Sequence, residues 1–360
     1  MTTATAARAV PEENGGLVVD WGDGRRSVFH GLWLRDNCGC PECRHPSGQR
    51  LVEVQTLADH PRVVAAGTVG DWIEARFDDG HAGRWQAEWL RAHGEGGSGH
   101  RQSPLRLWDA SLQESLPEFG YDDERGWLAA VDELGFAVLR GGPTAEGTVL
   151  EVAARFGFVR ETNYGRLFDV RSVVSPTNLA YTALALGAHT DNPYRDPTPT
   201  LQLLHCISSS TAGGDSTLVD GFRVAQELSD GDFGLLAGHP ISFRYADAST
   251  ELENEAPVLE LDAARRLRAV RFNTRSAAPL TLPTEIVEPY YRAYRAFARL
   301  LNAPEYQVRF RLEPGDLFIV DNLRVLHGRT GFESAEGERH LQGAYADRDG
   351  LRSTLAVLSR

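Results

Sequence analysis

The sequence predicts a mostly β protein with a few helices, of the α+β class, divided into two domains. Short segments that alternate apolar and polar residues fill residues 16–90 and return from about residue 168 onward. Between them, HGEGGSGHRQSP (93–104) is rich in Gly and Ser and has no hydrophobic periodicity, which is typical of a linker. The 360 residues also exceed what one compact core ordinarily supports. We therefore expect a small β domain over 1–95, a linker over 96–115 and a second domain over 116–360.

The N-terminal domain is predicted to be a small antiparallel β unit. Its apolar and polar residues alternate, and Gly and Asp-Asp-Gly turns separate the segments. The expected strand segments are LVVDW (17–21), RRSVFHGLWLRDN (25–37), LVEVQTL (51–57) and DWIEARFDDGHAGRWQAEWL (71–90).

The second domain begins with helices and continues mainly as strands. DERGWLAAVDELG (123–135) places its apolar residues on one helical face and stops at Gly135, and TAEGTVLEVAARFG (144–157) predicts a helix capped by Thr144. One long amphipathic helix, TEIVEPYYRAYRAFARLLN (284–302), interrupts the later strands. This pattern predicts a double-stranded β-helix, the jelly roll of cupin type. The expected strands are FAVLRG (136–141), TLQLLHCIS (200–208), DSTLVDG (215–221), RAVRFNT (268–274), DLFIVDN (316–322) and HLQGAYADRD (340–349).

Composition excludes several classes of protein. Hydrophobic residues make up 42% and charged residues 24%, a globular balance, and the net charge of −13 argues against a nucleic-acid binder. All 37 basic residues are Arg, so a P-loop lysine and a Schiff-base lysine are excluded. We find no signal peptide and no apolar run of membrane-spanning length, so we expect no membrane partner and a cytoplasmic location.

A histidine and a carboxylate lie two residues apart in His189-Thr190-Asp191. In an extended chain, such residues point to the same side and can bind one ion. His327 lies far downstream, and we expect it at the end of the strand that a Pro314–Asp316 turn begins. Two histidines and one carboxylate on a β scaffold form the ligand set of non-haem Fe(II) oxygenases, which leaves coordination positions open. Arg339, expected on the neighbouring strand, could bind the distal carboxylate of 2-oxoglutarate through two parallel hydrogen bonds.

Three cysteines, Cys38, Cys40 and Cys43, lie too close together for a disulfide framework and indicate a metal site. A tetrahedral structural zinc ion needs a fourth ligand. His45 and His81 are the candidates, and the short loop to His45 disfavours it slightly.

These motifs agree in order and spacing with one known family, over roughly residues 15 to 350. The chain resembles the γ-butyrobetaine hydroxylase and trimethyllysine hydroxylase family of Fe(II)/2-oxoglutarate dioxygenases. The segments that carry the resemblance are LRDNCGCPECRHPSGQR (34–50), AHTDNPYRDPTPTLQLLHCI (188–207), GGDSTLVDGF (213–222), PGDLFIVDNLRVLHGRTGF (314–332) and RHLQGAYADRD (339–349).

The resemblance implies a role for several residues. His189, Asp191 and His327 would bind iron, and Arg339, Ser216 and Leu204 would contact 2-oxoglutarate. His81 would complete the zinc site. The family's aromatic cage, which holds a quaternary ammonium by cation–π contacts, matches Tyr164, Phe168, Tyr181 and Tyr345. Asn178 and Asn273 would hold the substrate's carboxylate. The resemblance further implies a homodimer, with O₂ as oxidant and ascorbate as reductant.

The function that we expect is hydroxylation of a small trimethylammonium carboxylate, with γ-butyrobetaine converted to L-carnitine and succinate and CO₂ released. Two positions depart from the animal enzymes of the family. Phe168 replaces Trp in the cage, and Asn192, next to the metal-binding Asp191 and near the substrate, replaces Tyr. Because of these two differences, a different substrate remains an alternative, namely trimethyllysine, a trimethylammonio phosphonate or a biosynthetic amino acid. A non-catalytic, zinc-stabilised binding module is the alternative from another class of protein.

Overall fold

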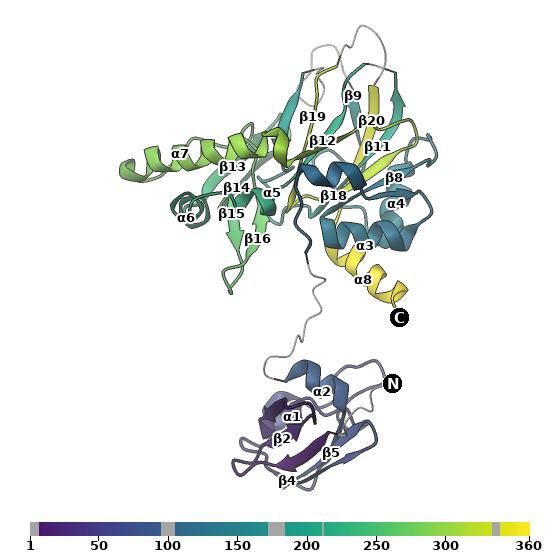
Figure 1. Cartoon of the computed structure of the whole chain (residues 1–360), viewed down its shortest axis with the longest axis vertical. Coiled ribbons are helices and arrows are strands. Elements are labelled where there is room, and N and C mark those ends of the chain that lie inside the picture. Colours follow the sequence, from purple (N-terminus) through teal and green to yellow (C-terminus); the bar gives the residue numbers. More distant parts are fainter. Residues whose placement is uncertain (1–6, 95–104, 172–183, 211, 333–338) are drawn as a thin grey trace. The chain divides into compact units, whose positions relative to one another are not determined.

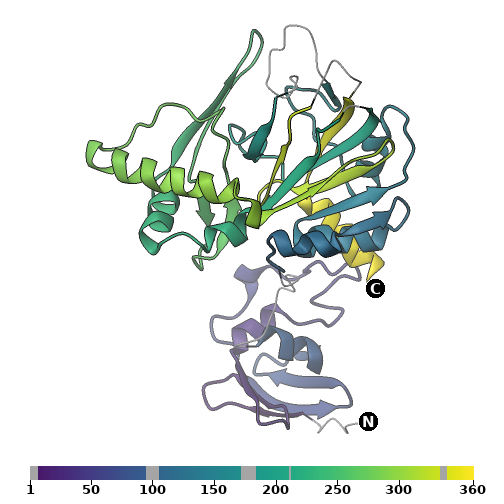
Figure 2. The same cartoon turned by 45° about the horizontal axis from the view of Figure 1, so that its top comes forward.

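The structure is a computed structural model, and it describes residues 7–94, 105–171, 184–210, 212–332 and 339–360. Its internal contacts divide the chain into a first unit, residues 1–102, and a second unit, residues 103–360. Figures 1 and 2 show both units. Among the residues that the structure describes, no helix combines the length and the apolar character that a membrane crossing requires.

The first unit contains two small antiparallel sheets around one apolar core. Its core includes Leu17, Phe29, Ile73 and Trp85, at inward positions of the alternating strands. The first sheet consists of β1 (Arg8–Pro11), β2 (Leu17–Asp20) and β3 (Arg26–Phe29), and the second of β4 (Val63–Val69), β5 (Trp72–Phe77) and β6 (Ala82–Gln86).

The predicted strands of this unit are wrong in three places. Residues 31–36 form helix α1 (Gly31–Asp36), because the His30 side chain accepts a hydrogen bond from the Leu32 N–H at 3.2 Å and caps the helix. The segment 51–57 contains only the 3₁₀ turn η1 (Val54–Thr56). The segment after β6 forms helix α2 (Ala87–His93) instead of continuing as a strand.

The second unit is a jelly roll, as predicted, with two facing sheets. Strand order in the larger sheet is β7 (Glu118–Gly120), β8 (Phe136–Arg140), β18 (Leu317–Asp321), β11 (Leu201–Ser209), β20 (Arg339–Ala346) and β9 (Phe168–Arg171). The smaller sheet has the order β10 (Leu186–His189), β19 (Val325–Arg329), β12 (Ser216–Asp220) and β17 (Gln307–Phe310).

Successive side chains along the strands of the larger sheet point to opposite faces, and each face packs into its own apolar core. In β18, Leu317 and Ile319 belong to the outer core, whereas Phe318 and Val320 belong to the core between the sheets. Helices α3 (Glu124–Leu134), α4 (Thr148–Phe156) and α8 (Arg348–Leu358) contribute to the outer core and cover that face of the larger sheet (Figure 1).

The predicted helix over 123–135 is confirmed, and Gly135 ends it in the left-handed conformation at φ 83°. The predicted cap of α4 is wrong. Gly147 precedes the first helical residue, and Thr144 lies outside the helix.

A third apolar cluster of this unit is formed mainly by the segment between β12 and β17. It combines the long predicted helix, α7 (Thr284–Leu301), with two short helices that were not predicted, α5 (Gly221–Ala225) and α6 (Asp230–Gly238). Figure 2 shows α7 running along this part of the unit. The cluster also includes two hairpins, formed by β13 (Ile241–Ala246) with β14 (Glu251–Ala256) and by β15 (Leu259–Leu261) with β16 (Leu267–Val270).

Two predicted strand placements need correction. The strand that follows the Pro314–Asp316 turn ends at Asp321, and His327 lies on β19 in the other sheet. The Asp321 side chain accepts a hydrogen bond from the Leu323 N–H at 3.0 Å, a turn that reverses the chain there. Arg339 begins β20 in the larger sheet, so it faces His327 from the opposite sheet rather than from a neighbouring strand.

Candidate active site and metal centres

His189, Asp191 and His327 converge between the two sheets. His189 and His327 are directly paired residues of β10 and β19, and Asp191 follows β10 two residues later. The distance from His189 Nε2 to Asp191 Oδ1 is 3.5 Å, and that from His327 Nε2 to Asp191 Oδ2 is 3.9 Å. The pairing of β10 with β19 therefore brings His327 next to His189 and Asp191, although His327 lies 136 positions after Asp191 in the sequence.

Both imidazoles direct a ring nitrogen toward Asp191. His189 Nδ1 donates to the Gly187 carbonyl oxygen at 3.0 Å, so Nε2, which lies near Asp191, is the nitrogen available to a metal. Burial, together with the neighbouring His189, lowers the pKa of His327 to about 3. Two imidazole nitrogens and one carboxylate oxygen, all within 4.8 Å of one another, fit a divalent iron ion.

Asp191 is held in place by hydrogen bonds from the larger sheet. Its carboxylate Oδ2 accepts from Gln202 Nε2 at 2.5 Å and from the Tyr345 hydroxyl at 2.8 Å. Its backbone N–H donates to Asn322 Oδ1 at 2.7 Å, and its carbonyl accepts from Asn322 Nδ2 at 2.9 Å. These bonds restrict the position of the carboxylate before a metal binds.

A cavity of about 90 Å³ adjoins the three ligands. Its walls come from both sheets, and they include Arg339, Ser216 and Leu204, the three residues expected to contact 2-oxoglutarate. Arg339 is only 7% exposed, and its Nε donates to the Gly214 carbonyl at 3.2 Å. Among the residues that the structure describes, no carboxylate lies within ion-pair distance of Arg339. The structure thus places a buried guanidinium beside the histidines, where an anionic ligand would compensate its charge.

A second arginine, Arg329, was not predicted from the sequence and lines the same cavity. Burial, together with the charges of Arg339 and Arg275, lowers its pKa to about 10. The cavity lining therefore includes two arginines, one from each sheet.

The three residues of the expected cage that the structure describes, Tyr164, Phe168 and Tyr345, form a continuous cluster. The Phe168 ring stacks on Tyr345 with centroids 5.1 Å apart and lies 6.1 Å from that of Tyr164. Gly343 makes room for Phe168, because a Cβ at this position would lie 2.3 Å from the phenyl ring. The cluster continues through two tyrosines that were not predicted, Tyr245 and Tyr194. Tyr181 and Asn178 lie outside the described residues.

The two remaining candidates for substrate contact, Asn273 and Asn192, are both buried. Asn273 already bonds to the backbone at both ends, since Nδ2 donates to Thr190 O at 3.1 Å and Oδ1 accepts from the Arg275 N–H at 3.2 Å. Asn192 adopts a positive φ of 54°, which Asn tolerates well, and its Oδ1 accepts from the Tyr194 hydroxyl at 2.7 Å. Its Nδ2 has no partner among the described residues.

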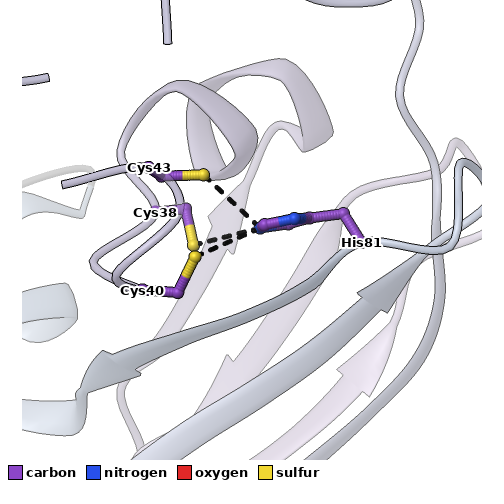
Figure 3. A group of neighbouring side chains, drawn as sticks. All are labelled: Cys38, Cys40, Cys43 and His81. Atoms are coloured by element: carbon purple, nitrogen blue, oxygen red, sulfur yellow. Dashed lines mark hydrogen bonds between the residues drawn. The ribbon is translucent and has the colours of Figure 1, made fainter. Parts of the chain in front are cut away.

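The first unit contains the cysteine cluster (Figure 3). His81 Nε2 points at all three sulfurs, at 3.3 Å from Cys38, 3.8 Å from Cys40 and 3.6 Å from Cys43. His45, the other candidate, instead lies 2.9 Å from the hydroxyl of Ser47 through its Nδ1. Three thiol groups and one imidazole around a single point fit a structural zinc ion.

A jelly roll that holds two buried histidines and one carboxylate together defines the class of mononuclear non-haem iron oxygenases. Residues 101–345 match the taurine catabolism dioxygenase TauD, TfdA family, and residues 9–93 match the γ-butyrobetaine hydroxylase-like N-terminal domain. The chain belongs to this dioxygenase family, in the group that carries the γ-butyrobetaine hydroxylase-like N-terminal domain.

Curated relatives extend over almost the whole chain. It is 39% identical to the γ-butyrobetaine dioxygenase of Pseudomonas sp. (strain AK-1), covering 96% of this chain and 94% of that protein. It is 33% identical to the human γ-butyrobetaine dioxygenase, covering 95% and 94%. The rat mitochondrial trimethyllysine dioxygenase is 30% identical, covering 92% and 82%.

A solved structure of asparagine oxygenase, in complex with Fe(II), 2S,3S-3-hydroxyasparagine and succinate, shares the fold. It superposes with a TM-score of 0.50 at 23% identity, covering 67% of this chain and 80% of that one.

Proposed function

We propose that this chain is an Fe(II)- and 2-oxoglutarate-dependent dioxygenase that hydroxylates γ-butyrobetaine to L-carnitine. The observation that carries the proposal is one buried cavity lined by His189, Asp191, His327 and Arg339, in a chain that matches named γ-butyrobetaine dioxygenases over nearly its full length. The intact set of these four residues also disfavours the alternative of a non-catalytic binding module.

One group of side chains would bind the metal and another group would bind the cosubstrate. His189, Asp191 and His327 would hold iron, which when bound supplies O₂ activation coupled to decarboxylation of 2-oxoglutarate to succinate and CO₂. Arg339 would bind the distal carboxylate, and Ser216 and Leu204 would contact the cosubstrate beside it. The apolar wall residues of the cavity, which include Phe318 and Leu341, would exclude water from the reacting atoms.

The aromatic cluster would bind the substrate's cation. A trimethylammonium group has no N–H to donate, so aromatic faces recognise it better than hydrogen-bond acceptors do. Phe168 contacts both Tyr164 and Tyr345, and the Tyr345 hydroxyl donates to Asp191. This arrangement supports a substrate whose cationic end lies a short distance from the metal ligands.

Phe168 and Asn192 favour a second candidate, the same chemistry on another substrate such as trimethyllysine, a trimethylammonio phosphonate or a biosynthetic amino acid. A phenyl ring is a weaker cation–π partner than an indole, and Asn192 offers an amide rather than a phenol next to Asp191. We propose, as finer points, that the protein works as a homodimer in the cytoplasm, where reducing conditions preserve the zinc-binding thiolates.

The test is succinate formation from 2-oxoglutarate in air, with Fe(II) and ascorbate. It compares γ-butyrobetaine, trimethyllysine and no added substrate, and mass spectrometry follows an added oxygen atom in the product. Succinate that forms only with γ-butyrobetaine supports carnitine synthesis, and succinate with another amine supports the second candidate. Absence of iron-dependent succinate with every substrate would refute the proposed chemistry, provided that the protein contains iron.

A further inference from the structure

The two carboxylate oxygens of Asp191 differ in the hydrogen bonds that they accept. Oδ2 accepts two hydrogen bonds, from Gln202 Nε2 at 2.5 Å and from the Tyr345 hydroxyl at 2.8 Å. Each oxygen also lies near a histidine ligand, Oδ1 at 3.5 Å from His189 Nε2 and Oδ2 at 3.9 Å from His327 Nε2, but Oδ1 accepts from neither Gln202 nor Tyr345. A carboxylate oxygen has two lone-pair sites, so these two donors occupy both sites of Oδ2.

The sheet fixes this pair of donors. Gln202 on β11 and Tyr345 on β20 are direct partners across the two strands, so their side chains leave the sheet next to each other on the same face. Gln202 is 2% exposed and Tyr345 is 3% exposed. The strand pairing and the burial of both side chains therefore hold the two donors next to each other, and together they act as a clamp on one oxygen.

Each donor also faces a ligand-binding region. Gln202 lines the cavity, and its Oε1 has no hydrogen-bond partner among the described residues. A buried acceptor without a partner favours a protic ligand in the cavity. Tyr345 stacks its ring on Phe168 while its hydroxyl bonds to Asp191, so one side chain joins the aromatic cluster to the metal ligand.

We propose that Gln202 and Tyr345 are positioning residues that hold Asp191 as a single-oxygen ligand through Oδ1. By occupying Oδ2, they prevent the carboxylate from binding the metal with both oxygens, which would take a coordination position that O₂ or the cosubstrate needs. Tyr345 also couples the two sites, because a cation against its ring strengthens its hydroxyl as a donor to Asp191. This inference rests on the proposed iron site.

The test measures metal binding rather than turnover. Tyr345→Phe removes one donor and keeps the aromatic ring, and Gln202→Leu removes the other. We expect each variant to bind Fe(II) about 10- to 100-fold more weakly, as is typical when a partner of a metal ligand is lost. The visible spectrum of the Co(II)-substituted protein should change, because a two-oxygen carboxylate alters the coordination number.

The coupling has its own readout. Adding γ-butyrobetaine to the Co(II) protein without 2-oxoglutarate should shift the spectrum of the wild type, and Tyr345→Phe should abolish this shift.

Matched controls separate the clamp from a loss of stability. Tyr290→Phe removes a fully buried hydroxyl that has no partner among the described residues, and Gln342→Leu removes a buried amide from the same strand as Tyr345. Gln342 bonds to Asp169 and to the Gly147 N–H, not to the metal ligands. Both controls should keep the wild-type Fe(II) affinity and Co(II) spectrum.

The outcomes distinguish this inference from the proposed function. Folded Tyr345→Phe and Gln202→Leu variants with wild-type affinity and spectra would overturn the clamp while leaving the dioxygenase intact. A wild type that binds Fe(II) but makes no succinate with any substrate would overturn the proposed function, and the affinity comparison would still decide the clamp. A wild type that binds no Fe(II) would overturn both.

Discussion

Asp220 and Arg324 form an ion pair in the interior of the second unit, with side chains 0% and 1% exposed. Asp220 ends β12, which carries Ser216, and Arg324 directly precedes β19, which carries His327. Arg324 Nε donates to Asp220 Oδ1 at 3.1 Å, and Nη2 donates to Oδ2 at 2.7 Å. The pair therefore joins the ends of two neighbouring strands that supply residues to the cavity.

We predict that Arg324→Met lowers the free energy of unfolding of this unit by about 3–5 kcal/mol, the usual cost of removing one partner from a buried pair. The substitution also removes donors from the carbonyls of Glu133 and Arg106, at 2.8 and 2.6 Å. Asp220 would keep only backbone donors, among them the N–H groups of Trp108 at 3.2 Å and Phe222 at 3.0 Å. Four charge-assisted bonds are lost, and the carboxylate stays buried.

Asp220→Asn keeps the shape of the side chain and removes the charge, so we expect a smaller loss of about 2–3 kcal/mol. In the double variant neither charge remains, and its loss should fall below the sum of the single losses by at least about 1 kcal/mol. Arg244→Met is the control, because Arg244 and Glu251 form an exposed pair with side chains 51% and 69% exposed, and no measurable loss is expected.

The assay is urea denaturation, monitored by the hydrogen exchange of peptides from β12 and β19, so that the signal reports the unfolding of the second unit. Additive losses in the double variant, or a loss below about 1 kcal/mol for Arg324→Met, would refute the reasoning that this buried pair is strongly coupled.

Three further predictions concern the cavity and the metal sites. Arg339→Met should raise the KM for 2-oxoglutarate about 10- to 100-fold, with Arg339→Lys recovering only part of it, as succinate assays would show; an unchanged KM contradicts this role. His81→Ala should lose the bound zinc, measured by elemental analysis, and with it the exchange protection of the first unit; retained stoichiometric zinc contradicts it. In metal-free protein, burial lowers the pKa of His327 to about 3 from 6.5 in the unfolded chain, so unfolding takes up a proton between these values. The contribution of neutral His327 to the free energy of unfolding should therefore be fully present above pH 6.5. Below pH 6.5 the free energy of unfolding should fall by up to about 1.4 kcal/mol per pH unit, as urea titrations would show. A free energy of unfolding that is constant from pH 7 to 5 contradicts this prediction.

Local patterns in the sequence predicted the elements that local interactions define. The helix over 123–135 has an apolar stripe and a terminal glycine, and both signals act within a few residues. The strands of the larger sheet are short apolar runs because helices cover one face and the smaller sheet covers the other.

The errors arose where a short-range signal competed with the alternating pattern. A histidine cap at His30 started a helix inside a segment that alternates like a strand. The Asp321 turn divided one apolar run into two strands of different sheets. An Asp-Asn pair within the run was the available signal for this reversal.

By itself, the sequence determined the chemistry that this protein has available. His189 and Asp191 are two positions apart, and Cys38, Cys40 and Cys43 share one turn, so these ligand types and spacings do not depend on remote contacts. Only the tertiary structure decided which remote side chains control those ligands. Asn322 and Tyr345 reach Asp191 across 131 and 154 positions of sequence. Their hydrogen bonds depend on which strands pair and in which register, and that is a property of the whole sheet rather than of any local segment.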